Sequence, residues 1–218
     1  MKGGDNIVKA AVKKPVTVTL SDGGASAHNR LCDLTAGLIA NSDFHMQCLY
    51  AADKLGLHDW MIGAGFVRNL IWDHIHGKTT ATPLNDIDLI YFDRQQADKS
   101  HDLALQKQLN QGAASPVWEV RNQARMHLKK GHEPYQNCTQ AISFWVETAT
   151  CVGVRLEQGM TRIIAPLGLA DNWAGIVRRN PAFSDPAVFL QRVAQKQWSS
   201  TWPQLRLDKE QRWTLNNF

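Results

Sequence analysis

The spacing of hydrophobic positions in the first half of the chain predicts helices around two short strands. Apolar residues at helical spacing over residues 30–55 predict two helices with a break near Ser42, which is a plausible N-cap for the second helix. A short apolar run at 59–63 predicts a buried strand, and helical spacing over 66–76 predicts a helix that ends at Gly77. The chain therefore passes through a strand, a glycine-rich turn and a helix in quick succession.

The strand predicted over residues 85–92 has two chemically different faces. One face is apolar, and its side chains are those of Ile87, Leu89 and Tyr91. The other face begins with two carboxylates, Asp86 and Asp88. Because successive side chains of a strand point to opposite sides, these two carboxylates lie next to each other on one surface.

Helical and strand patterns also alternate through the rest of the chain. The predicted elements are a helix over 99–110, a strand over 117–120, helical spacing over 122–129, strands over 151–156 and 161–164, and a helix over 186–197. We therefore expect an α+β fold in which helices flank a small mixed sheet. Glycine and lysine in residues 1–28 predict a flexible leader, in which 16–20 is a possible edge strand, and residues 29–218 are expected to form one domain with a C-terminal helical tail.

The composition excludes several classes of protein but does not identify an activity. The 218 residues include 24 Lys and Arg and 20 Asp and Glu, and the resulting net charge of +4 favours a phosphate-bearing ligand. The basic residues form no long stripe of the kind that binds nucleic acid. No apolar run approaches the roughly 20 residues of a membrane span, and no secretory pattern is present, so no membrane partner and a cytoplasmic location are expected. The cysteines form no C-x-x-C pair, which favours buried free thiols.

The candidate chemistry lies at Asp86 and Asp88, because neighbouring carboxylates can give oxygens to one hard cation such as Mg²⁺. A lone D-x-D triplet more often marks a solvated strand edge, and a glycine pair is usually only a turn. Here the triplet follows a turn at residues 63–65 and a helix start with Arg68, where backbone amides and the helix dipole favour phosphate. The combination is much rarer than either part, and it predicts a metal and nucleotide site.

The segments MIGAGFVRNLIWDHI and NDIDLIYFD resemble the nucleotidyltransferases of the DNA polymerase β-type superfamily, and within it a small bacterial nucleotidyltransferase-like family. The resemblance implies a polymerase β-like fold and a two-metal transfer of a nucleoside monophosphate from a nucleoside triphosphate to an acceptor, with Mg²⁺ on Asp86 and Asp88. Glu119 is the best match to the third catalytic carboxylate of that superfamily. The nucleotide-binding residues implied by the resemblance are Gly63, Ala64, Gly65, Arg68 and Asn69.

Several alternatives remain open at this point. Glu119 is equally consistent with the solvent-facing member of an alternating strand. A tRNA-end-adding or poly(A)-polymerase-like enzyme is a second reading, although Asn69 stands where that branch has Asp. An inactive nucleotide-binding or interaction module is a third reading. The acceptor is a protein, an RNA end or a small molecule. Tryptophans in apolar segments, at 60, 72, 118 and 145, predict core packing, whereas those at 198, 202 and 213 are expected to be available to a partner.

Overall fold

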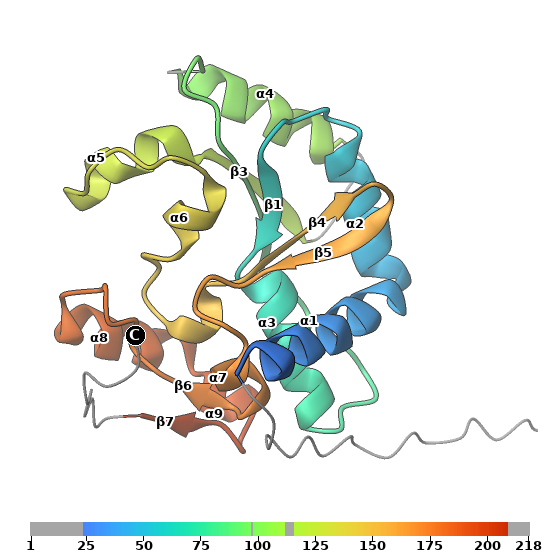
Figure 1. Ribbon diagram of the computed structural model, residues 1–218, viewed down its shortest axis with the longest axis vertical. Helices are drawn as coiled ribbons and strands as arrows, with labels where there is room; N and C mark the ends of the chain where they lie inside the picture. The colour runs from blue at the N-terminus through green and yellow to red at the C-terminus, as the bar shows by residue number, and fades with distance from the viewer. Residues whose placement is uncertain (1–23, 97, 112–115, 209–218) are drawn as a thin grey trace, which may run out of the picture.

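The computed structural model describes residues 24–96, 98–111 and 116–208, and Figure 1 shows their arrangement. The helices are α1 (Gly24–Ala40), α2 (Asp43–Asp53), α3 (Gly65–Ile75), α4 (Lys99–Leu109), α5 (Met126–Lys130), α6 (Cys138–Ile142), α7 (Ala170–Trp173), α8 (Pro186–Lys196) and α9 (Trp198–Thr201). The strands are β1 (Trp60–Gly63), β2 (Asp86–Tyr91), β3 (Val117–Asn122), β4 (Gly153–Glu157), β5 (Met160–Ile164), β6 (Ile176–Val177) and β7 (Arg206–Leu207). Single 3₁₀ turns are η1 (Gln123–Arg125) and η2 (Thr148–Thr150).

In the described part of the chain, five strands form one mixed sheet in the order β3-β2-β1-β4-β5. The central strand β1 pairs antiparallel with β2 and with β4, whereas β2 and β3 run parallel. The parallel register places Asp88 opposite Glu119. A second, two-stranded sheet pairs β7 in parallel with β6, the strand that follows α7.

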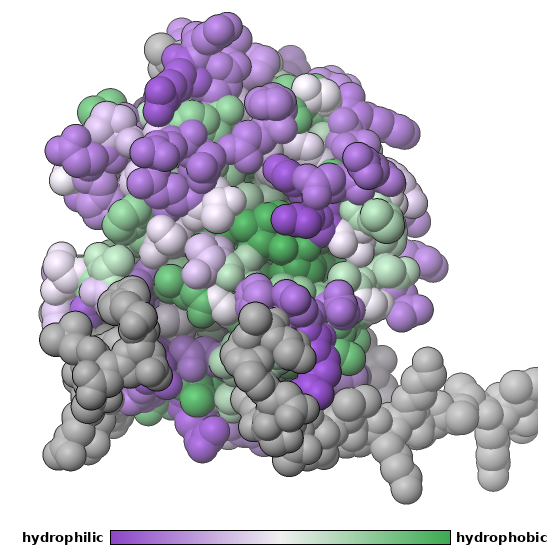
Figure 2. Space-filling model, viewed as in Figure 1, coloured by the Kyte–Doolittle hydropathy of each residue, from purple (hydrophilic) through white to green (hydrophobic). Residues whose placement is uncertain are grey.

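The two faces of the large sheet are covered differently. The face with Ile87 and Leu89 packs against α1, α2, α3 and α4 in one continuous hydrophobic core. On the other face, the short helix α6 packs against Met61 and Ile90 through its buried residues. This cover protects only the Ile90 end of β2, so the Asp86 end of the same face is left for polar contacts. In Figure 2, hydrophilic side chains dominate the face over α4 and α5, and hydrophobic side chains gather in a hollow near its middle.

The fold confirms the predicted mixed sheet with flanking helices, and most predicted elements differ only at their ends. Ser42 does stand at the N-cap of α2, but its hydroxyl bonds Nδ1 of His45 at 2.7 Å and not a backbone amide. Residues 24–28, expected in the leader, belong to α1, and the possible strand at 16–20 lies outside the described residues. The short elements α6, α7, α9, β6 and β7 were not predicted, because they contain too few residues to show a period.

The expectation that Trp198 and Trp202 are available to a partner is wrong. Their side chains are 5% and 3% exposed, and both rings pack edge-on against Trp72 of α3 at centroid distances of 5.4 and 5.2 Å. Trp213 lies outside the described residues. Trp145, expected in the core, is only partly buried. Residues 198–202, called the C-terminal segment below, are therefore part of the packed domain, because two large indoles bury their apolar surface against α3.

Asp73, near the end of α3, connects three separate segments of the chain. Its buried carboxylate accepts hydrogen bonds from the amide and the hydroxyl of Thr82 at 2.7 and 2.6 Å. It also accepts one from Nε1 of Trp202 at 2.7 Å and pairs with Lys78 at 3.6 Å. Asp73 thereby fixes the loop before β2 and the C-terminal segment to the same helix.

Three of the four cysteines are buried free thiols, as predicted, and Cys32 is partly buried. None of the helices in the described ranges is long and apolar enough to cross a membrane.

Replacing Asp73 by Ala is expected to lower the free energy of unfolding by about 3 kcal/mol, because it removes hydrogen bonds to a charged acceptor and leaves buried donors unpaired. Urea unfolding of the variant and the parent measures the difference. Asp53→Ala, at an exposed position of α2, is the control and should change stability by less than about 0.5 kcal/mol. Equal stabilities of the two variants would contradict the role given to Asp73.

Candidate active site

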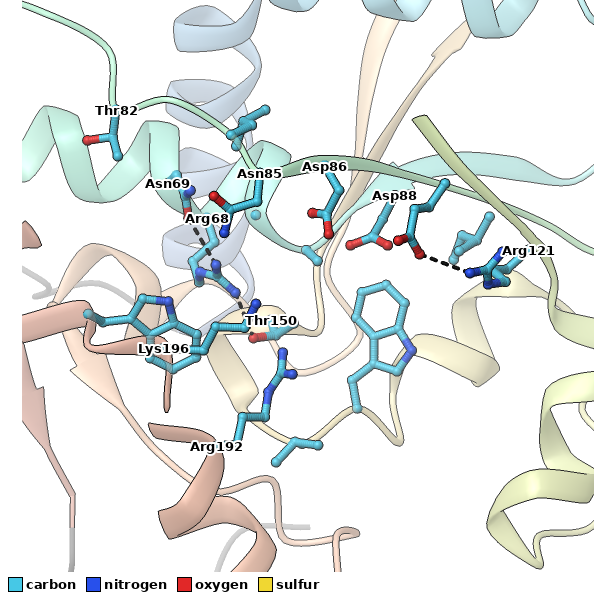
Figure 3. A pocket seen from close by; sticks show the side chains of 18 of the residues that line it. Arg68, Asn69, Thr82, Asn85, Asp86, Asp88, Arg121, Thr150, Arg192 and Lys196 are labelled. Atoms are coloured by element: carbon cyan, nitrogen blue, oxygen red, sulfur yellow. Dashed lines mark hydrogen bonds and ion pairs between the residues drawn. The ribbon is translucent and has the colours of Figure 1, made fainter. Parts of the chain in front are cut away.

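A cavity of about 470 Å³ opens between the Asp86 end of β2, the start of α3 and the C-terminal helix α8. Most of the residues predicted for the site line it together: Ala64, Gly65, Arg68, Asn69, Asp86, Asp88 and Glu119. Gly63 is not among the lining residues. Figure 3 shows Asp86 and Asp88 extending from β2 into this space, with Arg68, Arg192 and Lys196 gathered to one side of them.

The two aspartates lie on one face of β2, as strand parity requires, and both are partly buried. The pKa of Asp88 is raised to about 6, first because burial disfavours the charged form and then because of the neighbouring charges of Asp86 and Glu119. Arg68 and Lys196 oppose this rise. The carboxylates therefore form a concentration of negative charge that the protein's own cations do not fully neutralise.

Glu119 reaches the same cavity from β3 but bonds in another direction. Its carboxylate pairs with Arg121 at 3.0 Å, and both side chains are more than 40% exposed, at 44% and 43%. Among the described residues, no group of three or more His, Cys, Asp and Glu side chains is arranged to hold a metal. The structure thus brings Glu119 within electrostatic reach of Asp88, and its assignment as the third carboxylate stays a prediction.

The turn between β1 and α3 is built from a strained residue and a close contact. Ala64 has φ of 53° and ψ of −120°, a conformation that L-residues rarely adopt, and its amide donates to the carbonyl of Val152 at 3.0 Å. This amide is therefore not free for phosphate, contrary to the simplest reading of the turn. At Gly63, a Cβ would lie 2.8 Å from Cη2 of Trp145, so a larger residue there would have to displace that ring.

Arg68 is almost completely buried at the base of the cavity. Its guanidinium stacks on the rings of Trp72 and Trp198 at 5.0 and 4.6 Å, and donates to Oγ1 of Thr150 at 3.1 Å and to Oδ1 of Asn69 at 3.0 Å. Burial lowers its pKa to about 10, and the charge of Glu147 opposes that change. Nε of Arg68 is buried without a hydrogen-bond partner, and the residue as a whole lines the cavity.

Helix α8 contributes to this cavity, although its role was not predicted. Thr150 lines the cavity from η2, and Arg192 and Lys196 line it from α8. Arg192 and Lys196 are four residues apart on an amphipathic helix, so the sequence could have shown that both cations lie on one face. Nothing in that pattern indicated which part of the fold the face would meet.

Comparison with known proteins identifies the family of this chain. A family model described as nucleotidyltransferase matches residues 50–207, well over half of the chain. The chain belongs to this nucleotidyltransferase family. A comparison with curated proteins gave no match.

Among solved structures, this nucleotidyltransferase is similar to a protein whose NMR structure is described as revealing a CCA-adding enzyme head domain. The two are 29% identical with a TM-score of 0.72, over 82% of this chain and 96% of the other. More distant matches are a tRNA-processing enzyme complex, at 17% identity and TM-score 0.45 over 74% of this chain, and a CCA-adding enzyme with CTP, at 11% and 0.47 over 82%. This chain spans 43% of each of those two chains.

The raised pKa of Asp88 predicts a pH-dependent effect of Asp88→Asn on the metal-free protein. Since the pKa of about 6 in the folded state exceeds the ordinary aspartate value of 3.8, the native state loses stability as pH rises through this window. The variant should be up to about 3 kcal/mol more stable than the parent at pH 8 and nearly equal to it at pH 4, because each pH unit corresponds to about 1.4 kcal/mol. Urea unfolding with a chelator present measures both. A gain of the same size at both pH values would rule out titration as its cause.

Ala64→Gly should raise the free energy of unfolding by about 1 kcal/mol, because relief of about 1–3 kcal/mol of backbone strain outweighs the added entropy of the unfolded chain. The matched control is Ala104→Gly at an exposed position of α4, which should lower stability by about 0.5–1 kcal/mol. Thermal and urea unfolding report both changes. A loss of stability in both variants would show that the turn is not strained.

Proposed function

We propose that this nucleotidyltransferase moves a nucleoside monophosphate from a nucleoside triphosphate to an acceptor hydroxyl, with Mg²⁺ as its cofactor. The observation that carries the proposal is that Asp86 and Asp88 line the same cavity as the turn and helix start at residues 64–69. A site for hard cations thus adjoins a site with phosphate-binding features, which is the arrangement that nucleotidyl transfer requires.

The donor chemistry of the two aspartates suits Mg²⁺. Carboxylate oxygens are ligands of this ion, which takes one or two of them and keeps its other positions for water and phosphate. The pKa of Asp88 is raised first by burial and then by the negative charges of Asp86 and Glu119, and a bound divalent cation would offset those charges. When bound, Mg²⁺ would supply charge neutralisation for the phosphates and hold the reactants in line.

The protein's own residues have distinct parts in the proposed transfer. Arg68 would attract the phosphates through the charge of its guanidinium, with Asn69 and the backbone of Gly65 beside it at the start of α3. The acceptor oxygen bonds to the α-phosphorus while the bond from that phosphorus to the β-phosphate oxygen breaks, and pyrophosphate leaves. Glu119, paired with Arg121 at the cavity edge, is the candidate to take the acceptor proton.

An RNA end is a specific second candidate for the acceptor. It is favoured by the similarity to a head domain described as that of a CCA-adding enzyme, which the present chain matches over nearly the whole of that protein. Protein and small-molecule acceptors remain open under the same chemistry. An assay with tRNA transcripts that lack the terminal CCA, beside a panel of protein and small-molecule acceptors, distinguishes them.

Asp88→Asn is expected to abolish Mg²⁺-dependent transfer, by about 10³-fold or more, because it removes one of two charged ligands while keeping the side-chain shape. Incorporation of label from each α-³²P nucleoside triphosphate measures transfer, and calorimetry measures Mg²⁺-nucleotide affinity. Asp53→Asn, remote from the cavity, is the matched control and should behave as the parent.

The assignment of the metal ligand fails if Asp88→Asn binds Mg²⁺-nucleotide as tightly as the parent. The wider proposal fails if the folded parent binds no nucleoside triphosphate in the presence of Mg²⁺.

A further inference from the structure

Helix α8 brings two cations to the cavity from a part of the chain that the nucleotide-binding assignment does not include. Arg192 and Lys196 are separated by four residues, one helical turn, and both line the cavity that contains Asp86 and Asp88. Figure 3 shows both side chains on the same side of the cavity as Arg68. The region matched by the family model extends to residue 207 and so includes this helix.

Arg192 is held in place by a carboxylate that water does not reach. Its Nε donates to Oε1 of Glu147 at 2.7 Å, and Glu147 is 0% exposed. Oε2 of Glu147 accepts from Thr150 at 2.8 Å, and Thr150 in turn accepts from Arg68. One buried anion therefore orients guanidinium groups from α8 and α3 toward the same space. The terminal nitrogens of Arg192 make no hydrogen bond within the described residues. Because the side chain lines the cavity, these donors are available to a ligand there.

Lys196 also lines the cavity, and its side chain is more exposed than that of Arg192. Its ammonium group forms no ion pair or hydrogen bond with the residues that the structure describes, yet its charge acts on Asp88 and lowers that group's pKa. A long, flexible cation that faces a cavity without a partner is suited to a polyanion that arrives from solution. Because Glu147 already balances part of the charge of Arg68 and Arg192, the positive charge of Lys196 adds directly to the attraction for such a ligand.

We propose that Arg192 and Lys196 bind the terminal phosphates of the nucleoside triphosphate, the part that leaves as pyrophosphate. The inference rests on the proposed function. Transfer requires the α-phosphate beside Asp86 and Asp88, so the rest of the phosphate chain extends from there toward the cations of α3 and α8. The two α8 residues then recognise a triphosphate and not a monophosphate, since only the former reaches them.

The test uses ligands that separate the phosphate chain from the base. Calorimetry in Mg²⁺ compares inorganic tripolyphosphate, the four nucleoside triphosphates and the four monophosphates on the full chain. Lys196→Ala is the decisive variant, because this exposed residue has no structural partner in the described chain. Its affinity for tripolyphosphate and for the triphosphates should fall by at least about tenfold, the loss that accompanies one hydrogen bond to a charged group, with monophosphate affinity unchanged.

Two further variants supply a second test and a control. Arg192→Gln should give a loss at least as large, and its melting temperature is measured beside it because Glu147 loses its ion-pair partner. Lys107→Ala, an exposed cation of α4 outside the cavity, is the matched control and should bind all ligands within about twofold of the parent.

Each contrary result has a different meaning. Tripolyphosphate binding by Lys196→Ala that equals that of the parent overturns this inference and leaves the proposed function standing wherever the parent transfers nucleotide. Equal losses for mono- and triphosphates also overturn it, because the contact would then not be to the terminal phosphates. A parent that binds no triphosphate in Mg²⁺ overturns both proposals.

Discussion

The pairing of Glu147 with two arginines is the interaction on which the arrangement of the cavity depends. A carboxylate that is 0% exposed is strongly disfavoured unless cations and hydrogen bonds compensate it. Arg192 does so directly and Arg68 through Thr150, so helix α8 cannot move away from Glu147 without leaving a buried charge unpaired. The position of the C-terminal helix, and with it one wall of the cavity, follows from this requirement.

Charge is divided across the cavity between two elements of different rigidity. The aspartates lie on β2, which pairs with β1 and β3, whereas most of the cations that line the cavity lie on helices. A strand at the interior of a sheet gives fixed side-chain spacing, which would suit the ligands of the proposed metal. Among the cations, Arg68 is fixed against two indoles, whereas the exposed side chain of Lys196 is free to adjust to a ligand.

The sequence predicted those parts of the molecule that follow from local period. Strand parity placed Asp86 and Asp88 on one surface, and the strand, turn and helix order placed residues 64–69 at the cavity. It did not predict the fate of Trp198 and Trp202, because isolated tryptophans in short elements have no period to show which surface they meet. The roles of Glu147 and α8 were likewise hidden, since their pairing joins positions 45 residues apart.

Trp198 connects the C-terminal segment to Arg68, the residue proposed to bind phosphate. Its ring covers the guanidinium of Arg68 at 4.6 Å and packs against Trp72, so residues 198–202 supply part of the surface against which this cation, proposed to bind phosphate, lies. A cation between two indoles keeps its charge in a dry setting, where attraction for an anion is stronger than in water. Under the proposed function, phosphate binding at Arg68 and docking of residues 198–202 would be linked, because each would be more favourable when the other has occurred. The proposed nucleotide site would then depend on the whole fold and not on the strand and turn alone.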